Sequence, residues 1–321
     1  MDNINQIFGV LFQLAQSLLV VLLAPLLTGW VNQCGAWLQN RSGAGLMQPY
    51  RTLRKLFHKD AVMAHNASPL FRATPYILFG CMWLAAAIIP IIAVDLPFSP
   101  TADVIALVGV FALARVFIAL AAMDIGTSFG TLGARREMLV SFLAEPALLM
   151  VFFTASMISQ STQLTRIVEV LAHYEFVLYP SLAFAALAFV IVLLAENARI
   201  PVDNPSTHLE LTMIHEAMIL EYSGRHLAVI EAAASLKLLL YLSLIACVFA
   251  PWGIAAAGEG FTAFEIGLGT YFAKLAVGGF LLAVFETVTA KMRVFRVSDF
   301  LGAALMLGLL AALLLFVSQS V

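Results

Sequence analysis

Long apolar runs alternate with short polar segments along the whole chain. Each run has about 20 residues, the length that an α-helix needs to cross about 30 Å of hydrocarbon. The runs show no alternation of period two, which disfavours a membrane β-barrel. We therefore predict an all-α, polytopic membrane helical bundle that forms one integral membrane domain over residues 1–321. The pattern predicts about eight transmembrane helices: Ile7–Val31, Pro75–Val94, Val104–Met123, Leu139–Ser159, Phe176–Ala195, Leu227–Ala250, Ile266–Val288 and Phe300–Val317.

Composition supports the membrane class and excludes several others. The chain is 62% apolar and 11% charged, whereas soluble domains carry roughly a quarter charged residues. Its net charge of −2 gives no basis for a nucleic-acid partner. The three cysteines are isolated, so the sequence predicts no iron–sulfur site, zinc site or disulfide framework within this chain. The glycine-rich segment Gly126–Gly130 lacks the Lys-Ser/Thr pair of a phosphate-binding loop.

Basic residues predict the orientation in the membrane. The loops after the first, third, fifth and seventh spans carry 13 Lys or Arg residues, and the opposite loops carry Arg166 alone. Basic loops remain on the cytoplasmic side of a membrane. We therefore expect both termini on the outer, periplasmic side of a bacterial inner membrane. The main cytoplasmic loops are expected at residues 32–74, 124–138, 196–226 and 289–299.

Charged residues within the predicted spans need a separate explanation. A charge at bilayer depth costs at least about 2.5 kcal/mol on insertion scales, so it normally faces protein or water. Arg115, Glu145 and Lys237 lie deep in their spans, and we interpret them as functional because each needs a partner. Glu231 and Glu286 lie nearer the span ends, where placement at the interface and a functional role are both open.

One polar segment, Glu196–Gly224, combines carboxylates, prolines and histidines between two predicted spans. Its prolines should end the preceding helix. A new helix is predicted to begin after Ser206 or Thr207, to carry Glu210 in its first turn and to continue to Glu221. Two interpretations remain open. The segment is either a solvated loop or, because crowded carboxylates perturb one another, part of a proton path.

Four segments carry a family resemblance, namely Arg41–Phe57, Met123–Pro146, Glu196–Gly224 and Phe285–Arg293. Together they resemble subunit 1 of respiratory complex I and its relatives in membrane-bound [NiFe]-hydrogenases. In the second segment the Asp-x-Gly-Ser/Thr, Gly-Ala-x-Arg-Glu and Glu-Pro motifs look like the hydrogenase branch. Glu145 there is also similar to a glutamate of the respiratory branch.

The chain also departs from the family pattern. The family usually has a Glu-Ala-Glu-x-Glu run where this chain has Ser206–Glu210, so two carboxylates are missing. Glu216 and His215 are candidates to replace them. Lys237 matches a lysine of the hydrogenase branch, whereas Glu231 stands where that branch tends to carry a lysine.

The resemblance implies a non-catalytic subunit of an oxidoreductase complex of the energy-converting hydrogenase or formate hydrogenlyase type. Soluble iron–sulfur and hydrogenase-like catalytic subunits would dock on the cytoplasmic face, and antiporter-like membrane subunits would lie alongside. Iron–sulfur clusters and a NiFe centre would belong to those partners, with no cofactor or metal site in this chain. Candidates for the proton path or coupling are Arg115, Asp124, Glu145, Glu196, Asp203, Glu210, Glu216, Glu221, Lys237 and Glu286. Candidates for partner docking are Arg51, Arg54, Lys55, Arg135, Arg136, Arg199 and Arg293.

Two alternatives remain beside the coupling hypothesis. The chain could be the quinone-binding subunit of a complex I-like NADH:quinone oxidoreductase, with the first and sixth spans lining an apolar tunnel. It could also be a structural membrane anchor with no proton path. A free-standing transporter is disfavoured because the sequence shows no inverted repeat or pair of broken helices.

Overall fold

The computed structural model describes residues 2–91, 102–173, 180–203, 213–254, 261–292 and 296–320. Regular structure within these ranges is α-helical, apart from an isolated β-bridge between Asp103 and Gln163. The helices are α1 (Asp2–Leu38), α2 (Gln48–Phe57), α3 (Pro69–Ile88), α4 (Val104–Asp124), α5 (Ser128–Ser159), α6 (Leu164–His173), α7 (Pro180–Glu196), α8 (His215–Ile219), α9 (Gly224–Val248), α10 (Phe261–Val288) and α11 (Val297–Ser320).

The all-α prediction is confirmed for these residues, and seven helices among them are long and apolar enough to cross a membrane. They are α1, α3, α4, α5, α9, α10 and α11. The remaining predicted span, Phe176–Ala195, coincides with α7, which is apolar but has 17 residues. Residues 176–179 of that prediction lie outside the described ranges. At 1.5 Å per residue α7 is about 25 Å long, which is at the lower limit for a full crossing.

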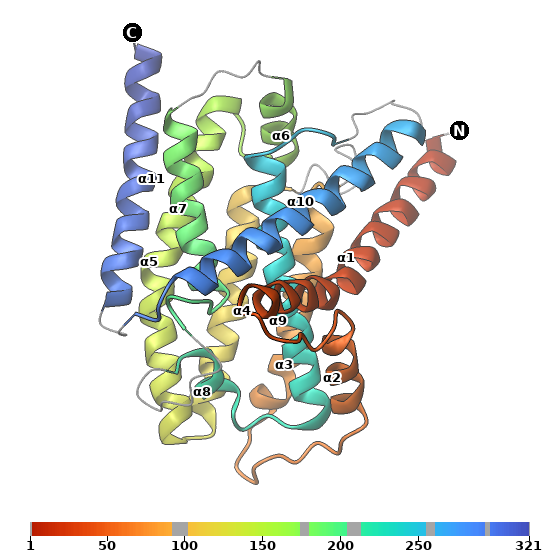
Figure 1. Cartoon of the computed structure of the whole chain (residues 1–321), viewed down its shortest axis with the longest axis vertical. Coiled ribbons are helices and arrows are strands. Elements are labelled where there is room, and N and C mark those ends of the chain that lie inside the picture. The colour runs from red at the N-terminus through yellow and green to blue at the C-terminus, as the bar shows by residue number, and fades with distance from the viewer. Residues whose placement is uncertain are drawn as a thin grey trace.

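The helices form a bundle with two oblique members. Figure 1 shows α3, α4, α5, α7, α9 and α11 running roughly along the long axis, while α1 and α10 cross one face obliquely. α1 packs against α10 and α9, and α11 packs against α5 and α7. Both chain ends lie toward one end of the molecule, whereas α2 and α8 lie toward the other (Figure 1).

α5 begins at Ser128, well before the predicted span start at Leu139. The hydroxyl of Thr127 accepts a hydrogen bond from the Gly130 amide at 3.3 Å and so caps the helix. The segment expected as a loop at 124–138 is therefore helical from Ser128 onward. This extension places Glu137 on the same helix as Glu145.

α7 ends abruptly at Glu196. The Arg199 amide donates to the Leu194 carbonyl at 2.9 Å, and the Ala198 amide donates to the Ala195 carbonyl at 3.2 Å. This is the Schellman pattern, which satisfies carbonyls at a helix C-terminus. Ala198 adopts φ +48°, in the left-handed region that costs a non-glycine residue roughly 1–2 kcal/mol. The turn keeps the Glu196 side chain on the last turn of an apolar helix.

Of the predicted helix from Ser206 or Thr207 to Glu221, the described part is helical only over His215–Ile219, which is α8. Met213 and Ile214 are not helical. The amides of Ile214 and His215 donate instead to Oδ2 of Asp203, each at 3.1 Å. These bonds turn the chain back on Asp203, so a continuous helix cannot form there. Glu210 lies outside the described residues.

Gly133 allows α8 to approach α5 closely. A Cβ atom at this position would lie 2.9 Å from both the Ala217 Cβ and the Ile214 carbonyl oxygen. Overpacking of this kind costs typically about 1–3 kcal/mol.

We expect Gly133→Ala to lower the Tm of the detergent-purified protein by at least about 2 °C. Gly109→Ala is the matched control, because nothing lies within 4 Å of its added Cβ. Equal Tm values for the two variants would contradict the close α5–α8 contact.

Candidate functional site

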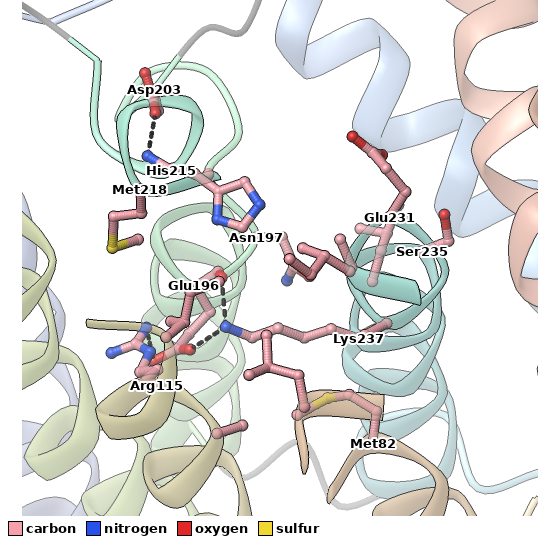
Figure 2. A pocket seen from close by; sticks show the side chains of 18 of the residues that line it. Met82, Arg115, Glu196, Asn197, Asp203, His215, Met218, Glu231, Ser235 and Lys237 are labelled. Carbon is pink, nitrogen blue, oxygen red and sulfur yellow. Dashed lines mark hydrogen bonds and ion pairs between the residues drawn. The ribbon is translucent and has the colours of Figure 1, made fainter. Parts of the chain in front are cut away.

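Four charged side chains, Arg115, Glu137, Glu196 and Lys237, form a central cluster that joins α4, α5, α7 and α9. The first three are buried, and the Lys237 side chain is 17% exposed. Arg115 Nε lies 3.4 Å from Glu137 Oε1, and the same guanidinium forms an ion pair with Glu196. Lys237 Nζ lies 2.9 Å from Glu196 Oε2 and donates to the Glu196 backbone carbonyl at 2.7 Å. Figure 2 shows both cations directed at Glu196 from opposite sides.

The central cluster is balanced in charge and removed from solvent. Two cations face two carboxylates, and the side chains of Arg115 and Glu196 are only 4% and 2% exposed. Arg115 also donates to the Ser141 hydroxyl at 2.8 Å, and the Tyr241 hydroxyl lies beside the Glu196 carboxylate. Removing one partner from such a buried pair typically costs about 3–5 kcal/mol, because the other charge is left uncompensated.

A cavity of about 350 Å³ borders this cluster. Its walls come from α1, α3, α4, α5, α8 and α9 and from the end of α7 with the turn that follows it. Apolar side chains such as Leu78, Met82 and Ile118 form part of the lining. The polar and charged lining residues are Thr28, Asn32, Arg115, Glu137, Glu196, Asn197, Arg199, Asp203, His215, Glu216, Glu231, Ser235 and Lys237.

Asp203 forms a second charged centre at the base of the turn after α7. Its side chain is buried, and Oδ1 lies 3.3 Å from Lys291 Nζ, which follows α10. Oδ2 accepts the two amide hydrogen bonds that start α8. Nearby, Arg199 lies 3.4 Å from Glu286 of α10. Two ion pairs therefore tie the turn after α7 to the C-terminal end of α10.

The other coupling candidates lie in varied surroundings. Glu145 is half-buried and within electrostatic reach of Arg115, but it does not line the cavity. Glu216 lines the cavity, whereas Glu221 is exposed outside it. Asp124 accepts a hydrogen bond from the Ser68 amide at 3.0 Å, which connects the end of α4 to the start of α3.

The docking candidates fall into two groups. Arg135 and three basic residues of α2 are exposed; those of α2 are Arg51, Arg54 and Lys55. Two others are already engaged within the chain, since Arg136 donates to the Met213 carbonyl at 2.8 Å and Arg199 pairs with Glu286. Arg293 lies outside the described residues.

α2 is held against α1 through Tyr50. The Tyr50 hydroxyl donates to the Leu22 carbonyl of α1. Burial raises the pKa of Tyr50, so the hydroxyl keeps its proton and remains a donor. The basic face of α2 is consequently presented at a fixed position beside α1.

Two members of the site were not singled out from the sequence. Glu137 was assigned to the loop at 124–138. The missed signal was Thr127, a helix cap that places Glu137 in the helix, one turn before Ser141 and on the face that meets Arg115. Tyr241 lies four residues after Lys237 on α9, so the helical spacing was the available signal.

A family model described as NADH dehydrogenase matches residues 12–317. The chain belongs to the NADH dehydrogenase family. The resemblance to complex I subunit 1 and its hydrogenase relatives is thereby confirmed. Together with the apolar helices, membership of this family identifies a helical membrane protein.

Named relatives of this NADH dehydrogenase family member fall in both branches. It is 34% identical to formate hydrogenlyase subunit 4 of Escherichia coli K12, over 89% of this chain and 92% of the relative. It is 34% identical to hydrogenase-4 component C of the same organism, over 77% of each chain. Identity to an NADH-quinone oxidoreductase subunit of Rubrobacter xylanophilus is 30%, over 67% of this chain and 66% of the relative.

A solved structure shares the fold. A chain in the structure of the membrane-bound sulfane sulfur reductase, an archaeal respiratory membrane complex, matches with a TM-score of 0.80. The match covers 96% of this chain and 99% of the other at 16% sequence identity. At that identity the likeness establishes the fold alone.

The charge balance of the central cluster predicts strongly non-additive substitutions. Glu196→Gln leaves two cations facing one carboxylate and should lower the stability of the purified protein by about 3–5 kcal/mol. Adding Lys237→Met restores the balance, so the double variant should recover part of that loss in a thermal or denaturant unfolding series. Arg166→Ala is the control, because its pair with Glu169 is exposed and such pairs contribute about 0–1 kcal/mol. A double variant as unstable as the sum of the single changes would contradict the coupling.

Proposed function

We propose that this chain is the membrane anchor and coupling subunit of an energy-converting hydrogenase or formate hydrogenlyase-like complex. It would dock a soluble iron–sulfur and catalytic arm and link that arm's redox reaction to proton movement. Support comes from the match to formate hydrogenlyase subunit 4 across nearly the full length of both chains. The observation that carries the coupling role is the buried, balanced central cluster beside a cavity.

The central cluster has the properties of an electrostatic switch. Protonation of Glu196 would leave Arg115 and Lys237 facing each other's charge with only Glu137 to compensate. Because these side chains come from four different helices, the two protonation states would favour different helix positions. A proton gained or lost at the cavity is thereby linked to a movement in the bundle. Neighbouring antiporter-like subunits would receive that movement, or the proton itself.

The proposed surroundings follow the same scheme. The chain would lie in a bacterial inner membrane with both termini outside and α2 and α8 on the cytoplasmic face. The exposed basic residues of α2, with Arg135, would contact acidic surfaces of the soluble subunits. Iron–sulfur clusters and the NiFe centre would reside in those subunits.

Quinone binding is a second candidate that the cavity specifically favours. The cavity lies between α1 and α9, the helices expected to line a quinone tunnel, and its volume falls in the range of small-molecule pockets. Its apolar part, around Leu78, Met82 and Ile118, suits a quinone ring. Inhibition of the intact complex by a short-chain quinone analogue would favour quinone binding over the coupling role alone. A purely structural anchor would show neither inhibition by the analogue nor coupling to proton movement.

Affinity purification tests the proposed complex directly. The tagged chain, extracted in mild detergent, should bring iron–sulfur subunits with it, and the sample should contain both iron and nickel by elemental analysis. Iron–sulfur subunits without nickel would favour the complex I-like quinone role. A chain that purifies alone and without iron would contradict the subunit assignment.

Carboxylate substitutions test the proton path. Glu145→Gln and Glu221→Gln should each lower the number of protons moved per electron pair by about half or more, because a neutral amide cannot relay a proton. Electron transfer by the soluble arm should continue. Proton uptake in inverted vesicles and redox turnover are measured on the same preparation. Glu169→Gln, in an exposed pair, is the control. Normal proton movement in both test variants would contradict the proposed path.

A further inference from the structure

Glu231 differs from the other acidic side chains that line the cavity. Glu137 and Glu196 pair with cations of the central cluster, and Asp203 pairs with Lys291. Glu216 is also engaged. Glu231, near the start of α9, makes no hydrogen bond or ion pair within the part of the chain that the structure describes. In Figure 2 its carboxylate points away from the Lys237–Glu196 contact.

Neutral oxygen-bearing side chains line the same cavity as Glu231. Ser235 follows it by one turn on α9, and Thr28 and Asn32 have the same four-residue spacing on α1, which packs against α9. The Thr28 hydroxyl donates to the Ala24 carbonyl at 3.3 Å, so its lone pairs remain free to accept. Small hard cations prefer carboxylate and neutral oxygen ligands of this kind. One carboxylate among neutral oxygens balances a single positive charge.

The other charged and titratable side chains to consider come from the helices that pack against α9 and from the rest of the cavity lining. α1 contributes none to the cavity, and those of α2, α3, α6 and α10 do not line it. Those from α9 and the elements packed against it are Tyr50, Arg51, Arg54, Lys55, Arg72, Tyr76, Arg166, Glu169, Arg225, His226, Tyr241, Glu265, Tyr271, Lys274 and Glu286. Those that line the cavity are Arg115, Glu137, Glu196, Arg199, Asp203, His215, Glu216 and Lys237. Among the described residues, none of these groups forms an ion pair with Glu231.

We propose that Glu231, with Ser235, Thr28 and Asn32, forms the loading site of the cavity for a small monovalent cation, either a proton or a sodium ion. This site rests on the proposed coupling function and gives it a point of entry. The cavity is continuous from Glu231 to Lys237 and Glu196. A cation that binds at Glu231 therefore reaches the central cluster through the same cavity.

Carbodiimide labelling of the intact complex in lipid nanodiscs tests the site. Dicyclohexylcarbodiimide adds to a protonated carboxyl group in apolar surroundings, and mass spectrometry of peptides locates the adduct. Glu231 should be labelled. Glu196 lines the same cavity but is held as a carboxylate by two cations, so it is the internal control and should stay unlabelled.

The labelling conditions distinguish the two cations. If the ion is a proton, labelling should fall by about tenfold per pH unit on the alkaline side and be indifferent to sodium. If it is sodium, replacing choline chloride by sodium chloride at one pH should suppress labelling several-fold. Thr28→Val should then weaken that protection. No labelling of Glu231, or labelling unaffected by both pH and sodium, would overturn the proposal.

Variants connect the site to ion movement. Glu231→Gln should at least halve the ions moved per electron pair while the complex assembles and its soluble arm turns over, and Glu231→Asp should retain most of the movement. Normal ion movement in Glu231→Gln would overturn the proposed loading role. Failure of the proposed function gives a different result, because the chain would then purify without redox partners whatever the labelling of Glu231.

Discussion

The carboxylate of Glu196 is the point at which four helices meet. It ends α7, binds the guanidinium of α4 and the ammonium of α9, and through Arg115 is connected to Glu137 of α5. Buried ion pairs of this kind often stabilise a protein less than apolar side chains of equal volume. The turn that presents Glu196 is itself strained, with Ala198 in the left-handed region. Both features oppose stability, and residues kept under such conditions are typical of functional sites.

The cavity beside this carboxylate has a lining of two unlike parts. In one, every charge is matched within the central cluster, so a change of protonation there disturbs a balanced set. Elsewhere in the lining, Glu231 forms no ion pair within the described part of the chain, and Ser235, Thr28 and Asn32 contribute neutral oxygens. A mobile ion can neutralise the Glu231 carboxylate, whereas the charges of the central cluster are neutralised by other side chains of the protein. In the proposed coupling function, this difference would set the direction in which an ion moves through the cavity.

Much of the architecture was predictable because apolar length determines where a chain can cross a membrane. Hydropathy located the helices, and the cost of buried charge identified Arg115 and Lys237 as residues that need partners. Helix ends were harder, because they depend on single hydrogen bonds: Thr127 extends α5 backward, and Asp203 interrupts the helix expected before Glu221. The wrong helix ends also caused errors in the predicted site. Glu137 joins the cluster only because α5 begins early, and pairing between distant helices has no local signal in the sequence.

Arg115 has a consequence for how the protein is made. Its partners Glu137 and Glu196 both follow it in the chain, so α4 is synthesised before either of them. The guanidinium must therefore enter the bilayer uncompensated, at a cost of about 2.5–3.5 kcal/mol on translocon scales. No other charged residue occurs between Val104 and Met123, and that uninterrupted apolar sequence offsets the cost. Polar substitutions on the lipid side of α4 would accordingly act during biogenesis, by delaying its insertion, even where the finished structure has room for them.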